Sequence, residues 1–261
     1  MKRLLPIFLF FSLLLSACVA PAPPRSASGG KAQWNHAADA LIVQVTAPSG
    51  FLPSELYQEV YIPETQIWGD GRITWGTYVD GEGYTLRTGR LTSEQMTLLL
   101  QRFAHVGFLL WRSHYQNGVA IDGAPRCISV ELAMPTVQHQ VCELAGGAPQ
   151  AFYTLFDFLV SGAGATGVPY TPTTAYIRTW PADTAVPFSQ SPISWPTDLF
   201  GLPASAALDG VWVQGEGLAH LWQAVLDDHY PVLTVADEHG IYALTMQIPG
   251  LNWGGHPTPK P

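Results

Sequence analysis

The feature that most constrains the fold is a pair of cysteines, Cys127 and Cys142, which frame two runs of alternating apolar and polar residues. If residues 133–136 form the turn of a hairpin, partners in the two runs have numbers that add up to 269, as 127 and 142 do. In that register each face of the hairpin collects residues of one kind, as a half-buried antiparallel pair requires. One face collects Ile128, Val130, Leu132, Val137, His139 and Val141, and the other collects Cys127, Ser129, Glu131, Gln138, Gln140 and Cys142.

This register predicts a cross-strand disulfide between Cys127 and Cys142. A bridge that closes a loop of about 16 residues stabilises a fold by roughly 3 kcal/mol. A metal site is the alternative, because His139 and Cys142 have a spacing that suits a helix or a knuckle. On a strand, however, residues of opposite parity point to opposite faces and cannot share an ion. We therefore predict a structural disulfide, and we expect His139 to be a hydrogen-bonded core histidine.

The first 17 residues have the pattern of a secretory signal peptide. Lys2 and Arg3 form a basic start, residues 4–15 form an apolar run, and small residues precede Cys18. A membrane-spanning helix needs about 20 apolar residues, so this run is too short to span a bilayer. We expect residues 1–17 to be removed and the mature chain to lie outside the cytoplasm, where thiols tend to oxidise.

The end of this segment, Leu15-Ser16-Ala17-Cys18, resembles the lipobox of bacterial lipoproteins. The resemblance implies that Cys18 is acylated, with palmitate among the possible chains, and that it anchors the mature protein to a membrane. Val19 rather than Asp follows it, which by the same resemblance implies the outer membrane in a host that has one, and otherwise the outer face of the cell membrane. An ordinary signal peptide cut near Ala17 or Ala20 is the alternative. Beyond residue 18 the chain resembles no family.

The charge of the chain narrows its possible partners. Removal of residues 1–17 takes away Lys2 and Arg3 and changes the formal charge from −8 to about −10. Such a surface repels phosphate backbones, so nucleic acid is excluded as a partner, and the lipid is expected to hold the protein at the membrane. Apolar residues make up 47% of the chain and charged residues only 12%, which is ample for a folded core.

Composition also divides the chain into segments. Pro, Ser and Gly dominate a linker that follows Cys18, and Gly, Pro and Thr dominate a connector in the middle of the chain. The expected segments are the signal peptide 1–17, the lipid-anchored linker 18–33, a first α+β part 34–162 with the disulfide hairpin, a connector 163–174, a second, smaller α+β part 175–251, and a flexible tail 252–261. The two parts hint at similar α+β halves, although no residue-level repeat supports a duplication.

Three amphipathic helices are predicted. The first is marked by a capping box of Thr92 and Gln95 at its start and by Gly107 at its end. The second begins near Pro149, and the third ends before Pro231. Because hairpins rather than helical crossovers connect the predicted strands, the pattern indicates an α+β fold with antiparallel β hairpins.

One of these hairpins is marked by Asp70-Gly71, which lies between two β-prone runs. A two-residue turn sets Trp68 opposite Ile73 and Trp75 opposite Gln66, which places both tryptophans on one face. We expect them to pack against a helix, and a stacking platform for sugar rings is the alternative.

A long, proline-rich segment, 181–205, carries or adjoins large aromatic side chains. They are Trp180, Phe188, Trp195 and Phe200. A loop of this length in a folded chain is usually functional or disordered, and the aromatics argue against disorder. Either they pack over a second core, which we favour, or they form a binding surface for a glycan, peptide or protein partner.

No local signature of catalysis is present: the sequence lacks Gly-x-Ser-x-Gly, His-Glu-x-x-His, Cys-x-x-Cys and a phosphate-binding loop. Asp237-Glu238-His239-Gly240 places two carboxylates beside an imidazole, but Asp first and Gly fourth are typical of a type I turn. Asp227-Asp228-His229 lies at the end of a predicted helix. Its carboxylates and imidazole could form a metal or acid–base site, but the triplet alone is a weak indication of one. We therefore assign no catalytic residue, no cofactor and no metal ligand.

These observations predict a membrane-anchored extracytoplasmic lipoprotein with a non-enzymatic binding or interaction domain in the cell envelope. The alternative is a tethered hydrolase of cell-wall or polysaccharide material, which would need two carboxyl groups about 5 to 9.5 Å apart in a cleft. The acidic residues available for it are Glu55, Glu59, Glu64, Glu82 and Asp183. Nothing in the sequence brings two of them together.

Overall fold

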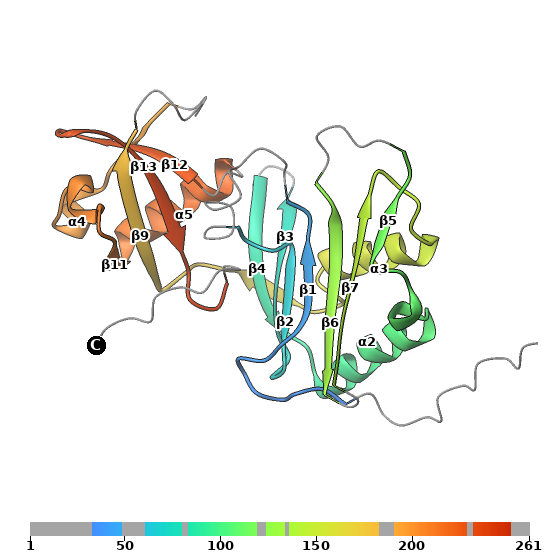
Figure 1. The fold of residues 1–261 in the computed structure, drawn as a ribbon. Helices are drawn as coiled ribbons and strands as arrows, with labels where there is room; N and C mark the ends of the chain where they lie inside the picture. Colours follow the sequence, from blue (N-terminus) through green and yellow to red (C-terminus); the bar gives the residue numbers. More distant parts are fainter. Residues whose placement is uncertain are drawn as a thin grey trace, which may run out of the picture. The chain divides into compact units, whose positions relative to one another are not determined.

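The computed structural model describes residues 33–48, 61–79, 83–118, 124–133, 136–182, 191–228 and 232–251. Their strands form two sheets, and helices accompany both (Figure 1). Neighbouring strands are antiparallel except where a short edge strand joins each sheet in parallel. The predicted α+β fold is confirmed.

The first sheet has eight strands in the order β5-β7-β6-β1-β2-β3-β4-β8. Their bounds are β1 (Leu41–Thr46), β2 (Thr65–Trp68), β3 (Arg72–Val79), β4 (Gly83–Arg90), β5 (His114–Gln116), β6 (Arg126–Ala133), β7 (Thr136–Leu144) and β8 (Gly167–Pro169). β1 pairs with β2 on one side and with β6 on the other. The sheet therefore joins two hairpins that are far apart in sequence.

The hairpin of β6 and β7 has the predicted register, with Cys127 directly opposite Cys142. The two cysteines form a disulfide, and their Cα atoms are 4.1 Å apart. Residues of the apolar face are buried in the core, among them Ile128, Val130 and Val141. The hairpin and its disulfide are confirmed.

His139 lies on the apolar face of this hairpin, opposite Val130. Its ring packs edge-on against Phe108, with 5.4 Å between the ring centroids. The buried Nε2 of His139 has no hydrogen-bond partner in the part of the chain that the structure describes. The hydrogen bond expected for a core histidine is therefore not made at this atom.

The turn between β2 and β3 differs from the predicted two-residue turn. Gly71, with a φ of 83°, donates its N–H to the carbonyl of Trp68 at 2.9 Å, as in a three-residue hairpin loop with a bulge. The longer loop shifts the register by one residue, so Thr65 opposes Trp75. Trp68 and Trp75 therefore lie on opposite faces of the sheet. The expectation of Gln66 opposite Trp75, with both tryptophans on one face, is wrong.

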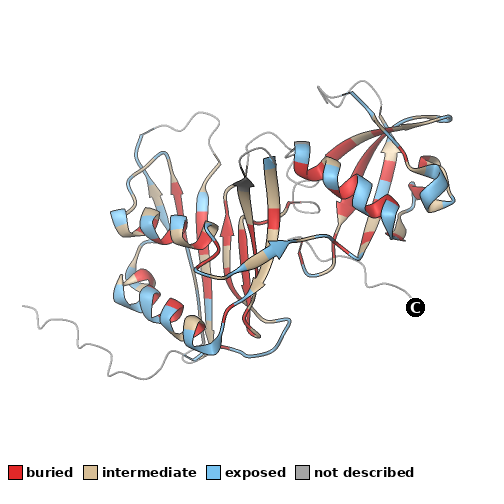
Figure 2. Cartoon of the chain, turned by 180° about the vertical axis from the view of Figure 1, so that it is seen from behind, coloured by how far each residue is buried: buried red, intermediate tan, exposed pale blue. Residues whose placement is uncertain are grey.

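Helices α2 (Ser93–His105) and α3 (Gln150–Val160) pack on one face of the first sheet, and a 3-10 turn, η1 (Phe108–Leu110), follows α2. Both halves of the predicted capping box form between Thr92 and Gln95. Buried residues lie on the side of each helix that faces the sheet (Figure 2). This face carries the first core.

Two strands of the first sheet have no clear sequence signal. Apolar and polar residues alternate only weakly along β4. Leu86 is the one residue of this strand that is fully buried. β8 covers three residues of the predicted connector 163–174 and pairs with β4. Tertiary pairing rather than local preference places both strands, since β propensity depends strongly on context.

The second sheet has the order β10-β12-β13-β9-β11. Its elements are β9 (Thr174–Pro181), β10 (Ile193–Ser194), α4 (Thr197–Phe200), the 3-10 turn η2 (Ala204–Ala207), β11 (Val211–Gln214), α5 (Glu216–Asp228), β12 (Val232–Asp237) and β13 (Gly240–Gln247). The third predicted helix corresponds to α5, whose apolar side, with Leu218, Leu221 and Trp222, lies in the second core. The hairpin of β12 and β13 turns at residues 237–240, where the sequence predicts a turn.

Candidate functional site

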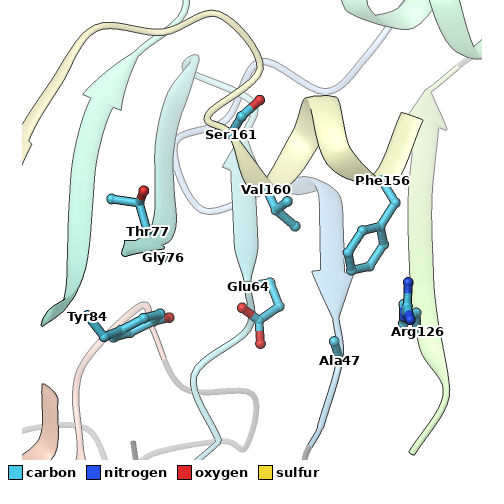
Figure 3. Close-up of a pocket in the computed structure, with 9 residues that line it drawn as sticks. All are labelled: Ala47, Glu64, Gly76, Thr77, Tyr84, Arg126, Phe156, Val160 and Ser161. Carbon is cyan, nitrogen blue, oxygen red and sulfur yellow. The ribbon is translucent and has the colours of Figure 1, made fainter. Parts of the chain in front are cut away.

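An open cavity of about 520 Å³ lies between α3 and the first sheet. Helix α3 and its C-terminal end contribute one wall, and the ends of several strands contribute the other (Figure 3). The lining residues are Ala47, Glu64, Gly76, Thr77, Tyr84, Arg126, Phe156, Val160 and Ser161. A cavity of this size holds a small molecule, and its lining combines aromatic and aliphatic surface with a few polar groups, as ligand sites do.

Glu64 is held in this cavity by the start of β2. Its carbonyl accepts the N–H of Gly76 at 3.0 Å, which extends the pairing of β2 with β3 to the residue before β2. Its carboxyl group is hydrogen-bonded by the hydroxyl of Tyr61. Tyr61 in turn accepts the N–H of Ala47 at 2.8 Å, so the proton of its hydroxyl is available to Glu64. This chain of hydrogen bonds fixes the carboxyl group at the edge of the sheet.

Burial changes the acidity of this carboxyl group. Desolvation raises the pKa of Glu64 from 4.5 to about 7, and the hydrogen bond from Tyr61 opposes that rise. The hydrogen bond favours the charged form, whereas the loss of water disfavours it more strongly. Near neutral pH, Glu64 therefore exchanges a proton easily, a property that is concentrated at functional sites.

Tyr84 reaches the cavity across a glycine. Tyr84 on β4 opposes Tyr78 of β3, and its side chain extends to Gly76, where a Cβ atom would overlap the Tyr84 hydroxyl. The absence of a side chain at Gly76 thus lets the Tyr84 ring lie flat along the sheet and point toward Glu64 (Figure 3). Any larger residue at position 76 would displace this wall of the cavity.

Arg126 and Phe156 form the opposite side (Figure 3). The Nε of Arg126 lies 4.0 Å from a carboxylate oxygen of the buried Glu143, and its guanidinium is 5.9 Å from the centroid of the Phe156 ring. Arg126 and Glu143 are direct neighbours across β6 and β7, next to the disulfide. The bridge therefore helps to hold this wall in place.

The geometry supports binding and proton exchange. Glu64 is the only carboxyl group among the described residues that line the cavity. In the same part of the chain, no three histidine, cysteine, aspartate or glutamate side chains gather as metal ligands would. The other acidic candidates of the hydrolase alternative, Glu55, Glu59, Glu82 and Asp183, lie outside the described residues.

The aromatic residues in and next to the segment 181–205 differ in how deeply they are buried. Trp195 is 3% exposed and belongs to the second core, where its Nε1 donates to the carbonyl of Leu202 at 2.8 Å. Phe200 is half-buried and packs against Trp195, with 5.1 Å between centroids. Trp180 is half-buried beside another small cluster, and Phe188 lies outside the described residues. Trp195 and Phe200 thus pack over a second core.

The acidic clusters of the second sheet have structural partners. Asp237 opposes Gly240 at the hairpin turn, and its carboxylate accepts the N–H groups of His239 at 2.8 Å and Ala204 at 2.7 Å. Asp227 accepts a hydrogen bond from Gln223 at 2.8 Å, while His229, like the predicted anchor residue Cys18, lies outside the described residues.

Sequence reasoning identified Glu64 only as an available carboxylate and did not identify Tyr61, Tyr84 or Arg126. One signal was present: the register that pairs the cysteines also sets Arg126 opposite Glu143. The remaining contacts depend on which strands become neighbours.

Among the described residues, no helix is both long and apolar enough to cross a membrane. The chain matches no protein-family model, no curated protein and no solved structure.

Proposed function

We propose that this protein is a lipid-anchored extracytoplasmic binding protein that holds a small ligand in the cavity beside Glu64. The cavity carries the proposal, because it combines aromatic surface with a fixed polar group. The lipobox of the signal segment supports the anchor at Cys18, and the acidic composition argues against nucleic acid as a partner.

The anchor is tested by the substitution Cys18→Ser. We expect the wild type to sediment with membranes and the variant to appear in the soluble extracytoplasmic fraction, because the variant lacks the acylated thiol. Immunoblots of the separated fractions measure this distribution, and intact mass gives the lipid on Cys18. Equal membrane association of both proteins would contradict the anchor.

The ligand site is tested with three aromatic probes of similar shape: benzylammonium, benzyl alcohol and benzoate. We expect at least one to shift NMR signals of residues that line the cavity, and Val160→Phe to abolish that binding by filling the space. Val168→Phe is the matched control, because Val168 is 63% exposed on β8. A result in which no probe binds, or in which both variants behave alike, would refute the site.

The tethered hydrolase of cell-wall or polysaccharide substrates is a second candidate, and the pKa of Glu64 favours it. A carboxyl group with a pKa of about 7 can act as a general acid at neutral pH. On this hypothesis the wild type releases soluble sugar from purified cell wall, and Glu64→Gln does not. We rank it second because no other carboxyl group among the described residues shares the cavity.

A further inference from the structure

The carboxyl group of Glu64 forms no ion pair with any described residue, whereas Arg126 in the same cavity is close to Glu143. The hydrogen bond from Tyr61 stabilises the charge only in part. Glu64 is half-buried, and a charge that has lost part of its water is costly unless it is paired. The cavity therefore offers a place beside Glu64 that suits a positive group.

The walls of the cavity suit the same kind of group. Tyr84 points its hydroxyl end toward Glu64, and Phe156 presents its ring on the other side (Figure 3), so aromatic surface flanks the carboxyl group. Val160 and Ala47 add apolar surface for the body of a ligand. The formal charge of −8 also favours the approach of cations over anions.

We propose that the cavity binds a ligand with a protonated amine, whose ammonium group pairs with the Glu64 carboxylate while its apolar body lies against Phe156 and Val160. This inference rests on the proposed function of the cavity as a ligand site. It adds the chemical class of the ligand, a small amine with an aromatic or aliphatic body.

The ammonium group binds the ionised form of Glu64, so a protonated Glu64 first releases its proton to water. The titratable or charged groups that face Glu64 are Tyr84 from β4, Arg126 from β6 and Tyr61 behind it. Tyrosine and arginine side chains ordinarily titrate at about pH 10 and above about pH 12, outside the neutral range. Glu64 is thus the group whose ionisation controls binding between pH 5 and 8.

The test compares the three probes over this pH range by NMR titration of the whole extracytoplasmic chain. Benzylammonium should bind about tenfold more tightly than benzyl alcohol at pH 8, because a charge-assisted hydrogen bond replaces a neutral one. Its affinity should fall about tenfold in total between pH 8 and pH 5, because protonation of Glu64 leaves a neutral site like that of Glu64→Gln. Benzyl alcohol should show no such dependence.

Two variants separate the charge of Glu64 from the shape of the cavity. Glu64→Gln should reduce the affinity for benzylammonium at pH 8 to that for benzyl alcohol and remove the pH dependence. Glu131→Gln, at an exposed position of β6, should behave like the wild type. The chemical shifts of the other residues report whether each variant is folded.

The outcomes distinguish this inference from the function on which it rests. Binding of benzyl alcohol or benzoate that is equal to or tighter than that of benzylammonium, and sensitive to Val160→Phe, would overturn the amine inference and leave the ligand site standing. Retention of the pH dependence by Glu64→Gln would also overturn it. Failure of every probe to bind in the cavity would overturn both.

Discussion

The double variant Cys127→Ala/Cys142→Ala is expected to unfold with a free energy about 3 kcal/mol lower than that of the wild type. The disulfide restricts the unfolded chain, and its removal frees the loop between positions separated by 15 residues. Both cysteines are buried at 7% exposure, so lost packing adds to the effect. Urea unfolding followed by tryptophan fluorescence measures the difference.

Reduction of the wild type provides the control for this prediction. Reductant should lower the stability of the wild type toward that of the double variant and leave the double variant unchanged. Equal stabilities of the oxidised wild type and the double variant would show that the cross-link adds nothing to the antiparallel pairing of β6 and β7.

The variant Glu64→Gln is expected to be more stable than the wild type at pH 8 by about 3 kcal/mol, since one pKa unit corresponds to about 1.4 kcal/mol. The pKa of Glu64 is about 7 in the folded protein against 4.5 otherwise, so the folded state binds the proton more tightly. Stability of the wild type is therefore lost as pH rises from 4.5 to 7, and the loss is complete above 7.

Urea unfolding of both proteins at pH 4 and pH 8 measures this effect. At pH 4 the carboxyl group is protonated in the folded and unfolded states, so the two proteins should have similar stability. A difference that is the same at both pH values would mean that lost packing or hydrogen bonding, rather than the charge of Glu64, causes it. Glu131→Gln should show little change at either pH.

The sequence predicted the disulfide hairpin well because two independent signals agreed. The alternation of apolar residues set the faces of β6 and β7, and the cysteines set the register between them. The capping box at Thr92 is similar, because hydrogen bonds within one helical turn depend on residues three apart. Signals of this kind depend on residues that are close in sequence or evenly spaced, so the structure that they predict does not depend on the rest of the fold.

The turn after Trp68 shows how such a signal can fail. Asp70-Gly71 is compatible with a two-residue turn and with a three-residue loop that ends in a bulge. The structure adopts the latter, and a shift of one residue moves Trp68 to the face opposite Trp75. The periodicity of the sequence alone does not determine how many residues form the loop.

The cavity could not be predicted, because its lining comes from six separate parts of the chain. Ala47, Glu64, Tyr84 and Arg126 meet only when β1 lies between β2 and β6 and when β3 pairs with β4. The raised pKa of Glu64 has the same origin, since it reflects the surroundings and not the residue itself. Neither the strand order of the sheet nor the desolvation of Glu64 produces a local pattern in the sequence.

The position of the disulfide beside Arg126 and Glu143 has a consequence for how the protein matures. Oxidation of Cys127 and Cys142 aligns the two residues that flank them, so closing the bridge also brings the guanidinium of Arg126, which lines the cavity, close to the carboxylate of the buried Glu143. In a reduced chain, only the pairing of β6 with β7 would hold Arg126 and Glu143 together. If the cavity binds a ligand as we propose, the redox state of the two cysteines would set what fraction of molecules carries the fixed wall.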